Sequence, residues 1–112
     1  MFDYELSPSA ENDLSEIANY TIQTWGSEQA AKYQHVLEER FIAIACKRAE
    51  ARTFLLHRPD LFVTHCERHH IFYQEREVEG PLIIAILHEK MDLMKRLQDR
   101  LEGSKRLLSA VD

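Results

Sequence analysis

The sequence predicts one α+β domain in which a helix hairpin packs on a mostly antiparallel sheet, in the order β-α-α-β-β-β, with a C-terminal helical extension. Three observations predict this class. Apolar residues recur at helical spacing in two stretches between residues 8 and 46, short strand-like segments fill residues 61–87, and a helical period returns after residue 92. A helix hairpin that covers one face of the sheet buries both apolar surfaces economically.

The first helix has clear start and stop signals. Residues 2–6 form a short predicted strand, and Ser7 and Pro8 then suit the capping position and the first helical position. Gly26 can take the left-handed conformation that ends a helix. The apolar face between these points consists of Leu14, Ile17, Ala18, Thr21, Ile22 and Trp25, and we expect Leu14, Ile17 and Trp25 in the core.

A second helix follows almost at once, with Ser27 as its expected cap. Two helices joined by one or two residues pack as an antiparallel hairpin. This helix is expected to end between Lys47 and Arg52. Its apolar face is formed by Ala30, Tyr33, Leu37, Phe41, Ile44 and Ala45.

Three strands are predicted after the hairpin. Residues 61–65 and 69–75 form two of them, with a tight turn at 66–68, and Gly80-Pro81 marks a second turn. Residues 82–87 contain no polar side chain, as in a central strand that is buried on both faces. This strand ends in a cluster of titratable residues, His88, Glu89, Lys90 and Asp92.

The tail, residues 91–112, carries an apolar stripe of Met94, Leu97 and Leu101, with Lys95, Arg96 and Arg100 beside it. Asp92 is its expected cap, and Gly103 is an expected break. Two alternatives are open for this helix. It folds back on the open face of the sheet, or it binds a partner as an amphipathic helix.

Composition narrows the function classes. The chain has 112 residues and a net charge of −5, which disfavours direct binding to nucleic acid, because phosphate binding needs a basic surface. No apolar run approaches the roughly 20 residues of a membrane span, and residues 1–8 lack the features of a signal peptide. The two cysteines suit a reduced, cytoplasmic protein. No cofactor motif is present, so no cofactor is expected.

Three segments together resemble the RelE/ParE superfamily of small bacterial toxins, and within it the ParE branch. The first is the helix hairpin, with Leu6-Ser7-Pro8, Asp13-Leu14, Ile17, Tyr20 and Trp25-Gly26. The second is the strand motif Arg68, His69, Ile71, Phe72 and Tyr73. The third is the last strand with Ile86-Leu87-His88 and Met91-Asp92. The resemblance covers residues 2–92, so we divide the chain into a toxin domain, 1–92, and a helical extension, 93–112.

The resemblance implies the toxin of a type II toxin–antitoxin system that acts in plasmid stabilization. Such a protein inhibits DNA gyrase rather than acting as an enzyme, and a cognate antitoxin neutralises it in a hetero-oligomer. The RelE branch implies the alternative, an mRNA endoribonuclease that acts on the ribosome. A third reading is a homologue that binds its antitoxin but is no longer toxic.

The predicted sheet offers weak support for catalysis. An endoribonuclease would use Arg68, Tyr73 and His88, but only Arg68 and Arg76 supply cations there, and several glutamates surround them. His88 can equally hydrogen-bond the backbone where its strand ends. His65, Cys66, His69 and His70 are zinc-ligand types, but neighbouring strand residues face opposite sides, so no metal site is expected.

Candidate residues for partner binding come from the hairpin and from the two strand motifs. Tyr20, Tyr33 and Val36 are expected on the outer sides of the hairpin, where a toxin bound by an antitoxin should expose apolar surface. The strand motifs add His69, His88, Met91 and Asp92. An acidic toxin favours a basic antitoxin segment.

Overall fold

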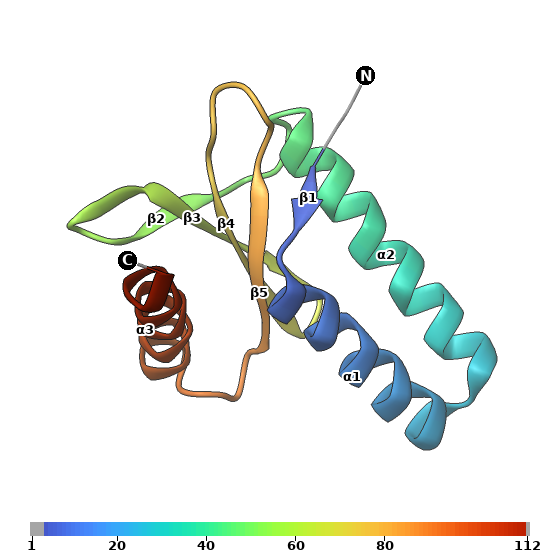
Figure 1. Ribbon diagram of the computed structural model, residues 1–112. Helices are drawn as coiled ribbons and strands as arrows, with labels where there is room; N and C mark the ends of the chain where they lie inside the picture. The colour runs from blue at the N-terminus through green and yellow to red at the C-terminus, as the bar shows by residue number, and fades with distance from the viewer. Residues whose placement is uncertain (1–3, 112) are drawn as a thin grey trace.

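Two helices in a hairpin and a third helix lie on opposite sides of a five-stranded sheet in the computed structural model, which describes residues 4–111, with side chains up to residue 102 (Figure 1). The predicted α+β class and the C-terminal helix are confirmed. The helices are α1 (Pro8–Trp25), α2 (Ser27–Ala45) and α3 (Leu93–Val111). The strands are β1 (Glu5–Leu6), β2 (Arg52–Leu55), β3 (Arg58–Cys66), β4 (His69–Gln74) and β5 (Leu82–His88).

The strands are arranged in the order β1-β5-β4-β3-β2. β1 pairs with β5 in parallel, and the other neighbours are antiparallel. Strand β5 therefore lies between two neighbours, as predicted for residues 82–87. The register pairs His69 with His88, which brings the two strand motifs together at one end of the sheet.

One strand, β2, is missing from the predicted order. It has only four residues and pairs with β3 through a bulge. Arg52 and Thr53 are exposed and Leu55 is buried, so the strand lacks the alternation of apolar and polar residues that would predict it from the sequence. Helix α2 ends at Ala45, before the predicted range of Lys47 to Arg52, and the segment that follows it ends in this edge strand.

The boundary signals of α1 are confirmed. Ser7 Oγ accepts a hydrogen bond from Ala10 N at 3.1 Å, Pro8 is the first helical residue, and Gly26 ends the helix with a φ of 95°. The prediction that Ser27 caps α2 is wrong. A single residue separates the two helices, so Gly26 flanks both, and Ser27 is already helical.

The hairpin packs one core against the sheet, but its tip extends beyond the strands (Figure 1). The buried core residues on this side include Ala10, Leu37, Phe41, Ile44, Ile71 and Ile83. Leu14 and Ile17 pack against them in part. The prediction that Trp25 lies in the core is wrong, since it is 62% exposed where the helix has passed the end of the sheet; Ile22, on the same face, is 47% exposed.

The opposite face of the sheet is covered by α3. Leu97 is fully buried in a cluster with Leu55, Leu61, Val63, Phe72, Ala85 and Leu87. Asp92 Oδ1 accepts from Lys95 N at 3.2 Å, which confirms the predicted cap. The alternative in which the tail folds back on the sheet is therefore the observed one. Gly103 does not break the helix, which continues through it to Val111. No helix in the described part of the chain is long and apolar enough to cross a membrane.

Candidate functional site

A groove with a volume of about 830 Å³ runs between α1 and the end of the sheet where β5 finishes. Its walls come from α1, the start of α2, the turn between β3 and β4, and the last residues of β5. The residues that line it are Asp13, Glu16, Ile17, Tyr20, Thr21, Trp25, Gln29, Tyr33, Glu67, Arg68, His69, Ile86, Leu87, His88 and Met91.

Large apolar side chains on the rim of this groove are open to solvent. Tyr20 is 67% exposed, Trp25 is 62% exposed, and Met91 is also exposed. Trp25 is uncovered because α1 continues past the strands, so the end of its apolar stripe has no sheet beneath it. Exposed apolar groups that cluster around a hollow are typical of a protein-binding surface.

The floor of the groove contains a tyrosine–histidine pair. Tyr33 Oη accepts from the backbone N–H of Arg68 at 3.3 Å and lies 2.6 Å from His69 Nδ1. Burial, together with the nearby His88, lowers the pKa of His69 to about 4. The imidazole is therefore neutral at pH 7, and since Tyr33 Oη already accepts from Arg68, its own proton is available for the bond to an unprotonated Nδ1. Burial also raises the pKa of Tyr33.

His88 ends β5 beside this pair. Its Nδ1 accepts from Lys90 N at 3.1 Å, so the imidazole holds the backbone where the strand ends. This is the alternative role that the sequence left open. The ring stands edge-on to His69 at 5.2 Å between centroids.

The three residues of an endoribonuclease do not come together. Arg68 and His88 line the groove, whereas Tyr73 is buried in the core under the hairpin and stacks on Phe62 at 5.6 Å. Burial raises the pKa of Tyr73, which opposes its use as a base at neutral pH. Among these three residues, the geometry lacks the shared approach to one phosphate that cleavage needs.

The predicted partner-binding residues separate into three groups. Tyr20, His69, His88 and Met91 line the groove. Tyr33 also lines it, but the placement of Tyr33 and Val36 on the outer sides of the hairpin is wrong, because both are half-buried against the core. Asp92 caps α3 and does not line the groove.

The histidines near the β3–β4 turn divide between the two faces of the sheet. His69 contacts Tyr33 on the hairpin side. On the other side, the ring centroids of His70 and His65 are 4.7 Å apart. His65 Nε2 is 3.1 Å from Glu89 Oε2. The described residues contain no group of three or more His, Cys, Asp or Glu side chains placed to hold a metal ion.

A second hollow, of about 600 Å³, lies at the opposite end of the sheet beside the β4–β5 loop. The guanidinium of Arg76 in its lining already has partners within the chain. Arg76 contacts Glu5 Oε1 at 3.0 Å, Glu79 Oε2 at 2.9 Å and the carbonyl of Gly80 at 2.7 Å. This hollow is held together by its own charges, so we take the groove beside α1 as the candidate site.

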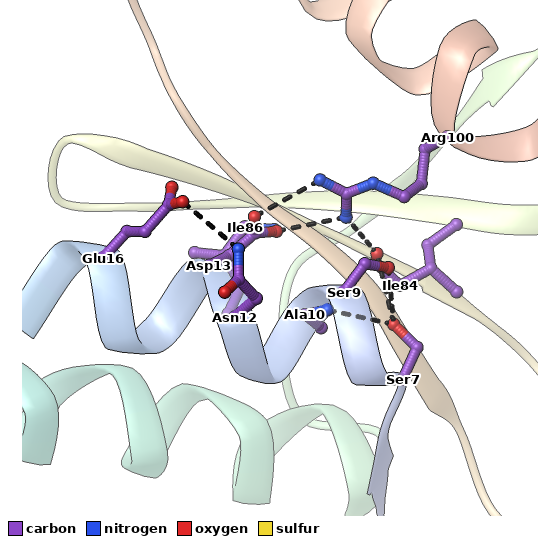
Figure 2. Close-up of polar contacts among 9 residues, drawn as sticks. All are labelled: Ser7, Ser9, Ala10, Asn12, Asp13, Glu16, Ile84, Ile86 and Arg100. Carbon is purple, nitrogen blue, oxygen red and sulfur yellow. Dashed lines mark hydrogen bonds and ion pairs between the residues drawn. The ribbon is translucent and has the colours of Figure 1, made fainter. Parts of the chain in front are cut away.

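Sequence reasoning missed an ion pair between a buried carboxylate in the groove lining and a partly buried guanidinium. Asp13 is 9% exposed, and its carboxylate meets the Arg100 guanidinium through two contacts of 3.1 and 3.2 Å (Figure 2). Asp13 Oδ2 also accepts from Ile86 N at 2.9 Å, and Arg100 donates to the carbonyl of Ile84 at 2.7 Å. We call Asp13, Ile84, Ile86 and Arg100 the clasp. The available signal was a carboxylate on the apolar side of α1, three residues after Ala10.

Comparisons with known proteins agree on one family. The model of the "ParE toxin of type II toxin-antitoxin system, parDE" matches residues 4–93. Toxin ParE from Escherichia coli is 40% identical over 103 residues, which cover 92% of this chain and all of that protein. Toxin ParE1 from Mycobacterium tuberculosis is 30% identical over 95 residues, covering 84% of this chain and 96% of that protein.

A solved structure has the same fold. It is described as the chromosomal ParDE TA system from P. aeruginosa, and the matched chain superposes with a TM-score of 0.65 at 16% sequence identity. The match covers 79% of this chain and 96% of that chain. At this identity the likeness concerns the fold alone.

Proposed function

This chain belongs to the ParE toxins of type II toxin–antitoxin systems, and from that premise we propose that it inhibits DNA gyrase and is neutralised by a cognate antitoxin that binds in the groove. The observation that carries the proposal is the groove itself, with its exposed aromatic rim and neutral floor. We take residues 1–92 as the toxin domain and residues 93–112 as a helical extension, whose helix α3 contacts the back of the sheet through Leu97.

Inhibition by binding is a better explanation of this site than phosphate chemistry. Arg68 shares the groove with Asp13, Glu16 and Glu67, so the local charge repels RNA. Tyr73, which an endoribonuclease would need, is buried elsewhere. We therefore place the action of the toxin on a protein target, and expect it in the cytoplasm, where gyrase works.

The antitoxin segment that suits this groove is amphipathic and basic. Apolar side chains would cover Tyr20, Trp25 and Met91, which the free toxin leaves exposed. Basic side chains would face Glu16 and Glu67, and complementary charge would mainly speed and direct the encounter. The product is a toxin–antitoxin hetero-oligomer.

A matched pair of charge substitutions tests the groove as the antitoxin site. Tyr20→Glu should weaken antitoxin binding by at least about tenfold, because an unpaired carboxylate would be buried in the complex. Val78→Glu is the control, since Val78 is 94% exposed in the loop at the other end of the sheet. Equal binding by both folded variants, measured by calorimetry, would show that the antitoxin uses another surface.

Induction in growing cells separates the three functional readings. A gyrase inhibitor should relax a reporter plasmid within minutes and leave mRNA intact. Primer extension that instead finds cuts at discrete codons, abolished by His88→Ala, would establish the endoribonuclease. Normal growth with folded, expressed protein would leave only the non-toxic homologue.

A further inference from the structure

Strand β5 would have an open edge beyond β1 if the clasp were absent. β1 pairs only at Glu5 and Leu6, opposite Leu82 and Ile83. Past that point, the Ile84 carbonyl and the Ile86 N–H lie along the same edge without a strand beside them; apart from the clasp, the carbonyl has a contact of 3.5 Å with Ser7 Oγ (Figure 2). Arg100 donates to the carbonyl, and Asp13 accepts from the N–H. Two side chains thus replace a neighbouring strand.

The two charged residues of the clasp come from opposite sides of the sheet. Asp13 extends from α1, and Arg100 reaches past β5 from α3 (Figure 2). Arg100 therefore ties α3, which covers the back of the sheet, to the helix that forms the wall of the groove. The tie adds to the contact that Leu97 makes with the sheet.

Asp13 belongs to both the clasp and the groove, because its side chain is also part of the groove lining. A carboxylate this strongly buried is costly to leave without a cation. A guanidinium matches it through two parallel hydrogen bonds, and the structure already holds one there, that of Arg100.

We propose that Asp13 is a binding subsite for a guanidinium or ammonium group of the antitoxin segment, and that Arg100 occupies this subsite in the free toxin. The inference rests on the proposed function, because it gives the groove ligand a basic side chain at a defined position. When that side chain reaches Asp13 from the groove, Arg100 gives up the carboxylate and α3 loses its tie. Antitoxin binding on one side of β5 thereby loosens the helix on the other side.

The coupling must act in both directions. When an internal group occupies a site, the apparent affinity of a competing ligand is multiplied by the fraction of molecules in which the site is open. Removing Arg100 should therefore strengthen binding of a basic ligand, whereas a purely structural role for Arg100 predicts unchanged or weaker binding. This opposite sign makes the inference testable.

The first experiment probes the subsite without any antitoxin. N-acetylarginine amide is titrated into the full chain while the amide resonance of Ile86, which donates to Asp13, is followed by NMR. We expect saturable binding about tenfold tighter to Arg100→Gln than to the parent, and none by the neutral analogue N-acetylcitrulline amide. Arg96→Gln, an exposed position one turn earlier on α3, should behave like the parent. Equal affinity for Arg100→Gln and parent, or equal binding of citrulline, would overturn the proposal.

The second experiment uses the unmodified toxin with its purified antitoxin, so it does not depend on the folding of a variant. Hydrogen exchange of the α3 amides around Leu97 should accelerate about tenfold on antitoxin binding, while α1 becomes protected. Protection of α1 with unchanged exchange in α3 would refute the inference and leave the proposed function intact. Failure of the antitoxin to bind at all would remove the proposed partner, and this inference with it.

Discussion

Leu97 is the residue through which docking of α3 is most directly tested. Its side chain is fully buried against the face of the sheet opposite the hairpin, in contact with a cluster that includes Phe72 and Leu87. Leu97→Ala removes three carbon atoms from this cluster and leaves a cavity. Such substitutions cost about 2–5 kcal/mol, from lost transfer free energy and the cavity together. Alanine favours the helix slightly more than leucine, so propensity does not add to the loss.

The assay is urea unfolding followed by far-UV circular dichroism. Gln98→Ala is the matched control, because Gln98 is the next residue on the same helix and is exposed. We expect the control to change the unfolding free energy by less than about 0.5 kcal/mol. If Leu97→Ala is equally silent, α3 does not pack on the sheet in solution, and the clasp cannot exist as described.

The remaining predictions concern titration, capping and the groove rim. The pKa of His69 falls from 6.5 to about 4 on folding, so the unfolded chain binds the proton first, and the unfolding free energy should decrease as pH falls from 6.5 to 4, by at most about 1.4 kcal/mol per pH unit. His69→Gln should flatten this part of the urea-midpoint profile; an unchanged slope would contradict the assignment. Ser7→Ala should cost about 1 kcal/mol in the same unfolding assay, through loss of the bond to Ala10 N, and no loss would show that the cap contributes nothing. Trp25→Ala should leave stability within about 0.5 kcal/mol but weaken antitoxin binding in calorimetry, whereas a large loss of stability would place Trp25 in the core.

Local signals predicted the boundaries of α1, whereas the expected cap at Ser27 and the expected break at Gly103 were wrong. Ser7, Pro8 and Gly26 act on the backbone next to them, so their effect does not depend on the rest of the fold. The exposure of Trp25 could not be predicted in the same way. Helical period identifies the face of α1 that points toward the sheet, but not the point at which the sheet ends beneath it.

Features that depend on distant residues were the ones that sequence reasoning missed. β2 has four residues and owes its conformation to pairing with β3. Asp13 and Arg100 are 87 positions apart, and neither has a neighbour in the sequence that identifies its partner. The strand motifs did predict part of the groove, because the β4–β5 register brings His69 and His88 together.

The proposal that this ParE-family protein acts on gyrase is tested most directly by a plasmid supercoiling assay with purified components. Relaxed plasmid, ATP and DNA gyrase are incubated with increasing toxin, with and without an equimolar amount of its antitoxin. The account predicts loss of supercoiling at micromolar toxin or below, and full recovery when the antitoxin is present. Unimpaired supercoiling at micromolar concentrations of toxin that circular dichroism shows to be folded would contradict it.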